Sequence, residues 1–283
     1  MKWTPEAETA IKKVPFFVRK KVRRRVESEA DAAGRRIVSL EDVKTTQKRY
    51  LSNMASEVKG YRLDVCFGPN GCPNRAMDTD ALVQRLDQIL REANLLDFLK
   101  QQVGERLKFH HEFRVTVAEC PNACSQPQIK DIGIIGARRP NITAEPCSCC
   151  GECQSTCPDE AITVREDHGP VIDFSRCLSC GKCIDLCPTG TLSEGIRGYK
   201  VLLGGKLGRH PKLAQVLPGI FDEDEVLDIV KTCIGFYKEK SRHGKRFAEI
   251  LTQEDFQSFV DRYSKPATME KRRPNHAEKK RNV

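Results

Sequence analysis

Cys147-Ser148-Cys149-Cys150-Gly151-Glu152-Cys153-Gln154-Ser155-Thr156-Cys157-Pro158 is the stretch that decides the fold of this chain. Its spacing, C-x2-C-x2-C-x3-C-P, returns 30 residues later between Cys177 and Pro188. Three thiolates this close together can wrap one face of an iron–sulfur cubane, and in this run the fourth cysteine ligates the cluster of the other copy. Two copies of the run therefore predict two [4Fe–4S] clusters.

The spacing rule divides the cysteines of the repeat into two crossed sets. One set is Cys147, Cys150, Cys153 and Cys187, and the other is Cys177, Cys180, Cys183 and Cys157. A pair of zinc sites is the alternative, but zinc ribbons use two CxxC pairs rather than this triple. Residues 144–195 resemble bacterial ferredoxin domains, which implies electron transfer. Between the copies, residues 161–164 and 171–174 flank a turn at 167–170, which predicts a hairpin.

Four further cysteines lie upstream of the repeat, as Cys66, Cys72, Cys120 and Cys124. The first two are separated by five residues and the last two by three, on Gly/Pro/Asn-rich segments beside expected strands. Four thiols on such loops can hold a third cluster. Spacing alone leaves zinc as a fair alternative here.

The residues around these four cysteines resemble the C-terminal half of sirohaem-type sulfite and nitrite reductases. The matching features are C-x5-C, the loop Cys120-Pro121-Asn122-Ala123-Cys124, and the segments 126–129, 131–136 and 204–211. A ferredoxin domain inserted into such a half resembles the dissimilatory and anaerobic reductase subunits. The resemblance covers residues 56–264. It implies a third [4Fe–4S] cluster on the four cysteines, with Cys124 and Asn122 as cofactor-binding residues and Cys124 bridging to the iron of a sirohaem.

One departure from that family leaves sirohaem binding open. The family has two homologous halves, and the first supplies most of the cations that grip sulfite and the sirohaem carboxylates. Here about 55 helical residues stand in its place, so a second copy or a separate subunit would complete the pocket. Lys206 and Arg209 are the candidate anion contacts, with Arg138, Arg139 and His210 as further candidates. Surface charge is the alternative for each.

The N-terminal residues predict a small helical module over residues 1–55. Thr4 is a plausible N-cap before Pro5, and Pro15 interrupts the helix. Val18, Val22 and Val26 form one apolar stripe, Gly34 suits a C-terminal cap, and Ser39 with Asp42 resembles a capping box. The stretch from Trp3 to Arg19 resembles the small C-terminal domain found in the B subunit of the light-independent protochlorophyllide reductases, from which no function is carried over.

The rest of the chain predicts an α+β fold, a reductase-like half domain with an inserted ferredoxin-like domain. The expected helices are one containing Leu82, Leu86, Ile89 and Leu90, and those over 222–237 and 253–263; the expected strands are 113–117, 131–135 and 199–203. His110 and His111 precede a strand and are expected to pack or lie at the surface. Cys149 is a spare thiol, and Cys233 is expected in the core.

Charge is concentrated at the two ends. The net charge is +9, but residues 1–25 carry +7 and residues 265–283 carry +5, which leaves −3 for the body of the chain. Residues 265–283 are expected to form a disordered basic tail. No base-reading module is visible, so nucleic acid is not an expected partner. No apolar run reaches the length of a membrane helix and no secretory h-region follows Met1, which predicts a cytoplasmic chain.

The sequence as a whole predicts an iron–sulfur oxidoreductase of an anaerobe, with three [4Fe–4S] clusters. Electrons would pass from a donor protein through the ferredoxin clusters to the Cys66/Cys72/Cys120/Cys124 centre, and with sirohaem present to sulfite or nitrite. One alternative is an electron-transfer protein or subunit with no substrate site of its own. Another is a regulatory or assembly protein that docks by its basic ends. No Ser/His/Asp triad, phosphate loop or GxGxxG element is visible.

Overall fold

The computed structural model describes residues 1–14, 16–67, 71–104 and 107–264. The chain divides into two compact units, of which one contains residues 1–59 and 103–112 and the other contains residues 60–102 and those from 113 onward. Among the described residues, no helix is long and apolar enough to cross a bilayer. Two expectations from the sequence fall on residues outside the described ranges. They are the helix interruption at Pro15 and the disordered basic tail over residues 265–283.

The first unit is built from three helices and a two-stranded parallel sheet. The helices are α1 (Pro5–Lys12), α2 (Phe16–Ala32) and α3 (Leu40–Glu57), and the strands are β1 (Lys2–Trp3) and β2 (Ile37–Val38). The Thr4 hydroxyl accepts from the Ala7 N–H, and Ser39 and Asp42 form a reciprocal capping box, so both expected caps are confirmed. The β1–β2 pair was not expected from the sequence.

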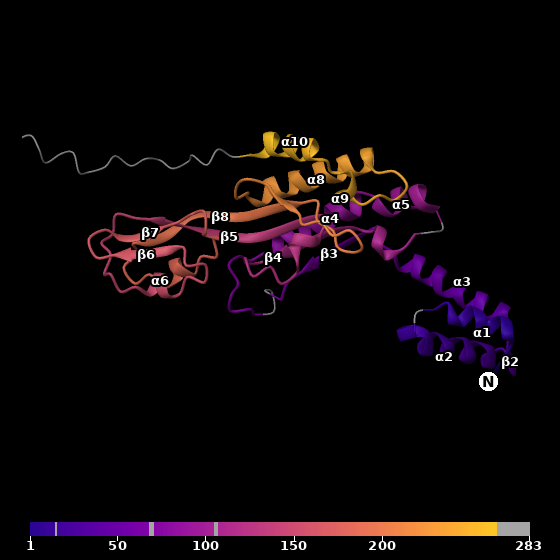
Figure 1. The fold of residues 1–283 in the computed structure, drawn as a ribbon. Coiled ribbons are helices and arrows are strands. Elements are labelled where there is room, and N and C mark those ends of the chain that lie inside the picture. The colour runs from indigo at the N-terminus through magenta and orange to yellow at the C-terminus, as the bar shows by residue number, and fades with distance from the viewer. Residues whose placement is uncertain (15, 68–70, 105–106, 265–283) are drawn as a thin grey trace, which may run out of the picture. The chain divides into compact units, whose positions relative to one another are not determined.

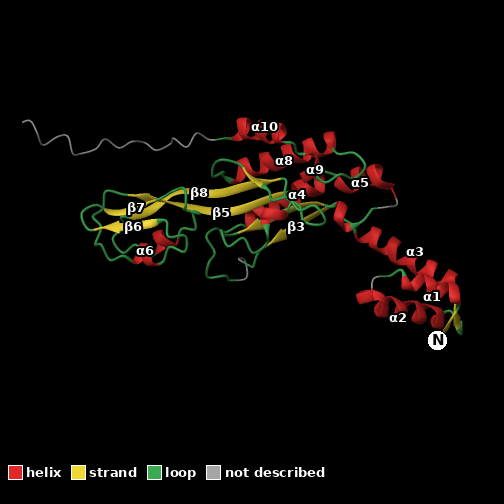
Figure 2. Ribbon diagram, viewed as in Figure 1, coloured by secondary structure: helices red, strands yellow, loops and turns green. Residues whose placement is uncertain are grey.

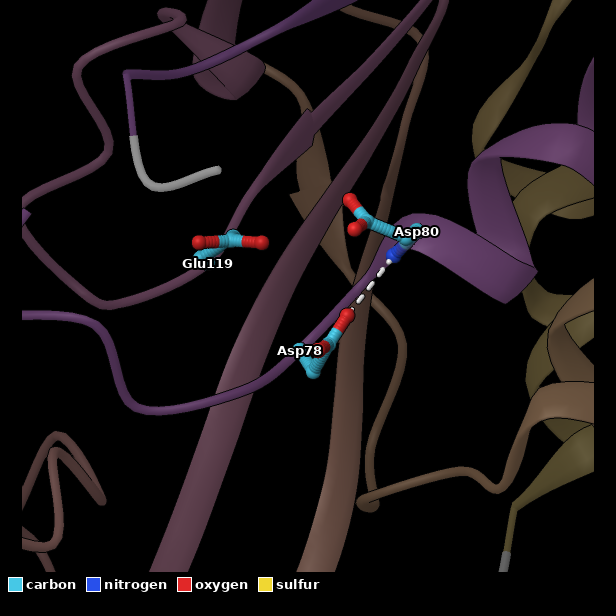
Figure 3. A group of neighbouring side chains, drawn as sticks. All are labelled: Asp78, Asp80 and Glu119. Carbon is cyan, nitrogen blue, oxygen red and sulfur yellow. Dashed lines mark hydrogen bonds between the residues drawn. The ribbon is translucent and has the colours of Figure 1, made fainter. Parts of the chain in front are cut away.

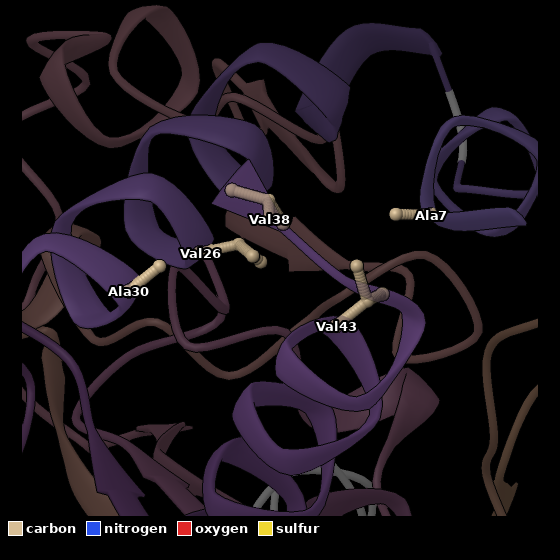
Figure 4. Packing of buried hydrophobic residues seen from close by; sticks show 5 residues of the cluster. All are labelled: Ala7, Val26, Ala30, Val38 and Val43. Atoms are coloured by element: carbon tan, nitrogen blue, oxygen red, sulfur yellow. The ribbon is translucent and has the colours of Figure 1, made fainter. Parts of the chain in front are cut away.

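The core of this unit joins all of its helices. Ala7, Val26, Ala30, Val38 and Val43 form one buried cluster, shown in Figure 4. Val22 packs at its edge together with Trp3, whose indole N–H donates to Glu27 at 2.8 Å. Val22 and Val26 therefore belong to the expected apolar stripe of α2 that faces the core.

The second unit contains a five-stranded mixed sheet in the order β3-β4-β5-β8-β9. The strands are β3 (Tyr61–Val65), β4 (Phe113–Ala118), β5 (Ile132–Ile142), β8 (Leu192–Leu203) and β9 (Gln215–Val216). The first three are parallel, whereas β8 runs antiparallel to both β5 and β9. Helices and a mixed sheet confirm the α+β class.

The two faces of this sheet carry different layers. Helices cover one face of the sheet (Figure 1). On that face Phe113 of β4 contacts Tyr237, with ring centroids 5.0 Å apart, and Phe247, at 5.7 Å. These helices are α4 (Asp80–Glu92), α5 (Leu95–Val103), α8 (Glu223–Lys240), α9 (Phe247–Ile250) and α10 (Gln253–Tyr263). The opposite face carries a second cluster of Ala118, Ala123, Ile135 and Leu202. Successive side chains of a strand point to opposite faces, so each strand contributes side chains to both layers.

The longest ladder of the sheet carries the segment between β5 and β8. The ladder runs from the pair Ile132–Leu203 to the pair Ile142–Leu192 and projects beyond the other strands of the sheet (Figure 2). Its register shifts between Arg139 and Pro140, where Gly195 is left without a partner on β5. At its end lie a hairpin and two short helices, namely β6 (Ile162–Arg165), β7 (Gly169–Ile172), α6 (Glu152–Ser155) and α7 (Lys182–Asp185).

The sequence predicted the position of most of these elements but underestimated the length of the strands β5 and β8. The helices at 222–237 and 253–263 and the strand at 113–117 are confirmed within three residues, and the hairpin is confirmed with its turn ending earlier than expected. The strands expected at 131–135 and 199–203 are much longer. Their distal parts contain charged residues and glycines, so no alternating apolar pattern marks them.

Substitution of Leu86 tests the packing of α4 against the sheet. Leu82, Leu86 and Leu90 are all 0% exposed, so Leu86→Ala should leave a cavity and destabilise the unit by about 2–5 kcal/mol. A lower midpoint of thermal unfolding, followed by circular dichroism, would report this loss. Gln84→Ala, at an exposed position of the same helix, is the control; equal midpoints for the two variants would contradict the packing assigned to Leu86.

Candidate functional site

The two copies of the cysteine repeat adopt the same backbone conformation. Left-handed residues recur at an offset of 30, at Cys149 and Ser179, Gly151 and Gly181, and Glu160 and Gly190. Each copy also begins a one-turn helix directly after its glycine, α6 in the first and α7 in the second. A cysteine on each helix is 8% exposed, Cys153 in one and Cys183 in the other. The segment is therefore two-fold pseudo-symmetric.

The first predicted set of four cysteines lies around one pocket. Its lining includes Cys147, Cys150 and Cys153 from the first copy and Cys187 from the second. Burial raises the pKa of the Cys153 thiol, and the thiols of Cys147, Cys150 and Cys187 add to that rise. The fourth cysteine therefore comes from the other copy, as the spacing rule requires.

The second predicted set is arranged in the same crossed manner. Burial and the neighbouring thiols together raise the pKa of Cys183 to about 12; these neighbours are Cys180, Cys177, Cys153 and Cys157. Cys177 and Cys180 belong to the second copy, whereas Cys157 belongs to the first. Cys153 also belongs to the first copy and lines the pocket of the first set. The presence of Cys153 among these neighbours shows that the two sets are adjacent.

The third set gathers at the ends of two neighbouring parallel strands. Cys66 follows β3 and its N–H donates to the Val117 carbonyl of β4 at 3.0 Å, while Cys120 and Cys124 follow β4. Burial raises the pKa of Cys120, and the thiols of Cys66, Cys72 and Cys124 contribute to that rise. Cys120 is buried whereas Cys124 is exposed. One thiol of this set is therefore open to a group outside the fold.

Backbone N–H groups point at several of these sulfur atoms. The N–H of Ala161 lies 3.3 Å from Cys157 Sγ, and that of Leu192 lies 3.3 Å from Cys187 Sγ. Burial alone would raise the pKa of Cys187, but the bond from Leu192 and those from Thr189 and Gly190 outweigh it and lower the pKa. Such donors stabilise the thiolate form, which is the form that binds metal.

The donor sets suit iron–sulfur clusters. Each is a group of four soft thiol ligands, and two of the groups carry the spacing of two-cluster carriers. The exposed Asn122 donates its backbone N–H to the sulfur of Cys120. Hydrogen bonds of this kind to the sulfur atoms are one of the factors that tune the potential of a bound cluster.

A group of carboxylates lies beside the third set, and its buried member, Glu119, is held by protein partners. Asp78, Asp80 and Glu119 approach one another (Figure 3). Glu119 is 1% exposed, accepts from the Thr79 hydroxyl at 2.9 Å and lies 2.8 Å from the Arg75 guanidinium. Its own N–H donates to Cys66 Sγ at 3.3 Å. Glu119 therefore braces the cysteine loops, a role that no sequence signal indicated.

Comparison with known proteins places the chain in a family. Residues 61–271 match the model described as the nitrite and sulphite reductase 4Fe-4S domain. The chain belongs to this family. The resemblance to sulfite and nitrite reductases expected from the sequence is thereby confirmed. Residues 3–46 of this reductase-family chain also match the model described as the proto-chlorophyllide reductase 57 kD subunit.

Individual relatives have also been compared with the chain. A coenzyme F420-dependent sulfite reductase of Methanocaldococcus jannaschii is 31% identical over 199 residues, which are 69% of this chain and 29% of that protein. The B subunit of a light-independent protochlorophyllide reductase of Pelodictyon phaeoclathratiforme is 58% identical over 41 residues, which are 14% of this chain and 8% of that protein. The chain thus spans less than a third of the length of either curated relative. The crystal structure of dissimilatory sulfite reductase I has a TM-score of 0.47 at 20% identity, over 77% of this chain and 55% of that one.

The candidate anion contacts of this reductase-family chain differ in their surroundings. Lys206 Nζ lies 2.7 Å from Glu249, and Arg138 is held by both Asp185 and Glu194. Arg139 stacks over the ring of Phe174 at 3.9 Å from its centroid. Arg209 and His210 are exposed on the loop between β8 and β9. Arg209 and His210 are thus the candidates that face solvent.

The remaining sequence candidates are not members of the three sets. Cys149 is exposed within the first ligand loop, and its Sγ lies 3.6 Å from the Glu166 carbonyl. Cys233 is 0% exposed on α8, which confirms it as a core residue. His110 and His111 form part of a short 3-10 helix, Phe109–His111, in the first unit.

The two equivalent glycines of the repeat offer a matched test of the second loop. Both Gly151 and Gly181 are left-handed, but a Cβ on Gly181 would lie 2.9 Å from Arg138 Cβ, whereas one on Gly151 would meet nothing within 4 Å. Arg138 has little freedom to withdraw, because two carboxylates hold it. Gly181→Ala should therefore lower the thermal unfolding midpoint more than Gly151→Ala, which carries only the backbone strain of about 1–2 kcal/mol. Equal midpoints would contradict the close contact.

Proposed function

We propose that this chain is an iron–sulfur oxidoreductase of the sulfite and nitrite reductase type. Its segment 144–195 acts as an inserted ferredoxin domain, and its third centre receives the electrons. The observation that carries the proposal is the grouping of twelve cysteines into three sets of four, two of them related by the 30-residue repeat. Family membership supports the nature of the third set.

Each set would hold one [4Fe–4S] cluster. The outer set is Cys147, Cys150, Cys153 and Cys187; the inner set is Cys157, Cys177, Cys180 and Cys183; the third set is Cys66, Cys72, Cys120 and Cys124. When bound, such clusters accept and release single electrons. The loop that carries Cys177 and Cys180, here called the inner loop, is attached to the sheet. The Arg138 N–H of β5 donates to the Ser179 carbonyl of this loop at 2.7 Å. Electrons would enter at the outer set and leave through the third.

Cys124 would hold a sirohaem, and the haem would supply the site at which sulfite or a similar oxyanion accepts the electrons. Exposed Cys124 supports this role, since its thiol can reach a group that the fold does not enclose. The exposed side chains of Arg209 and His210 would contact carboxylates or the anionic substrate, and Lys206 would take part only after leaving Glu249. A second copy or another subunit would complete the pocket, and a separate donor protein would supply electrons in the cytoplasm of an anaerobe.

A second candidate function is electron transfer without a substrate site of the chain's own. The pairing of Lys206 with Glu249 and of Arg138 with Asp185 favours this alternative, because two of the expected anion contacts are neutralised within the chain. The two functions share all three clusters and differ in whether Cys124 holds a sirohaem at which a substrate binds.

Iron and sulfide analysis tests the number of clusters. Anaerobically purified protein should contain about twelve irons per chain, and Cys120→Ala should contain about eight, because it removes a ligand of the third set. Cys149→Ala is the matched control, since Cys149 lies in a ligand loop outside the sets, and it should keep all of its iron. About eight irons in the unsubstituted protein would remove the third cluster from the proposal.

The visible spectrum separates the two candidate functions. Protein produced with an adequate sirohaem supply should show sharp bands beyond the broad iron–sulfur absorption, and Cys124→Ser should lose them while both insert clusters keep their electron paramagnetic signals. Sharp bands that survive in Cys124→Ser would refute its bridging role. A spectrum without such bands in the unsubstituted protein would leave only the electron-transfer function.

A further inference from the structure

Lys200 of β8 lies on the sheet face that carries the third set. It is paired with Ile135 of β5, and Ile135 and Leu202 pack in one cluster with Ala118 and Ala123. Directly paired residues of antiparallel strands share a face, as do residues two apart on one strand. Ala118 and Ala123 flank Cys120 in the sequence. The stem of Lys200 therefore starts on the face packed against the loop of the third set.

The ammonium group of Lys200 ends at the inner set. Its Nζ donates to the carbonyl of Leu178 at 3.1 Å, and Leu178 follows Cys177 directly within the ligand loop. The side chain thus spans from the sheet to the loop that precedes Cys180. Its contacts therefore connect the ligand loop of the inner set with the sheet face that carries the third set.

The charges that act on Lys200 belong to the inner loop and its neighbours. Burial lowers the pKa of Lys200, while the Cys177 thiol and Asp159 raise it and Arg139 lowers it. Arg139 lies four pairs along the ladder on the same face and stacks on Phe174, three residues ahead of Cys177. Among the charged groups that act on Lys200, Arg139 is a second cation and Asp159 is the carboxylate.

The outer set has acidic neighbours instead. Glu152 lines its pocket, and Glu166 raises the pKa of Cys149 in its ligand loop, although burial raises that pKa more. The pseudo-symmetric backbone thus holds two chemically equal sets of thiols in electrostatically unequal surroundings. Net charge around a cluster is one of the determinants of its reduction potential.

We propose, on the basis of the proposed function, that Lys200 is a positioning residue for electron transfer out of the insert: it fixes the inner loop on the sheet and holds a positive charge beside the inner cluster. The charge favours the reduced form of that cluster over the reduced form of the outer one. Transfer moves one electron from the reduced outer cluster to the oxidised inner cluster. No bond forms or breaks, and Lys200 keeps its proton.

Redox titration of the holoprotein, followed by electron paramagnetic resonance, tests this role. Lys200→Met should lower the midpoint potential of one insert cluster and leave the other unchanged, so that the equilibrium constant between them changes about tenfold, or about 59 mV for one electron. Lys200→Arg should restore the potential. Lys231→Met removes an equal charge at an exposed position of α8 and should leave both potentials unchanged.

Lys200→Gln separates the charge of Lys200 from its hydrogen bond. Glutamine keeps an N–H donor for the Leu178 carbonyl but carries no charge. Lys200→Gln should therefore lower the midpoint potential of one insert cluster. It should also keep its full iron content, even if Lys200→Met loses a cluster. Unchanged potentials in a fully loaded Lys200→Gln protein would overturn the role of Lys200. Absence of insert clusters in the unsubstituted protein would instead overturn the proposed function.

Discussion

The crossing of the fourth cysteine between the two repeats is the constraint on which the insert depends. Cys187 completes the pocket of the first copy, and Cys157 lies among the thiols of the second. Neither copy can assemble a set of four alone, so both must fold around each other. The hairpin β6–β7 lies between the copies in the sequence and allows the chain to turn back on itself. The matching left-handed positions in the two copies follow from the same requirement.

A second level of organisation connects this insert with the reductase-like sheet. The parallel strands β3 and β4 end side by side and bring Cys66 close to Cys120, while Glu119 braces their loops through Thr79 and Arg75. The ladder β5–β8 leaves the same sheet and carries the insert. Arg138 and Lys200 then contact the inner loop from two different strands of that ladder. The sheet is therefore the common support of all three sets.

The sequence predicted which cysteines lie near one another better than it predicted the residues that support them. Metal-ligand spacing is a local property, so the positions of Cys147 and Cys177 in the chain already implied crossed sets. The α+β class, the capping box at Ser39 and the core position of Cys233 also followed from local patterns. The brace by Glu119 and the contact of Lys200 with Leu178 depend on strand register and join residues distant in sequence, which no periodicity encodes.

Gly195 has no partner in the β5–β8 ladder, so the strand register on one side of it is independent of the register on the other side. Side chains alternate between faces with a period of two, so one extra residue reverses the facing of everything beyond it. Changes of length on the insert side of Gly195 need not shift the register of Ile135 and Lys200 on the sheet side. The bulge thus separates two parts of the ladder, so the segment between β5 and β8 can change in length or sequence while the five-stranded sheet keeps its register.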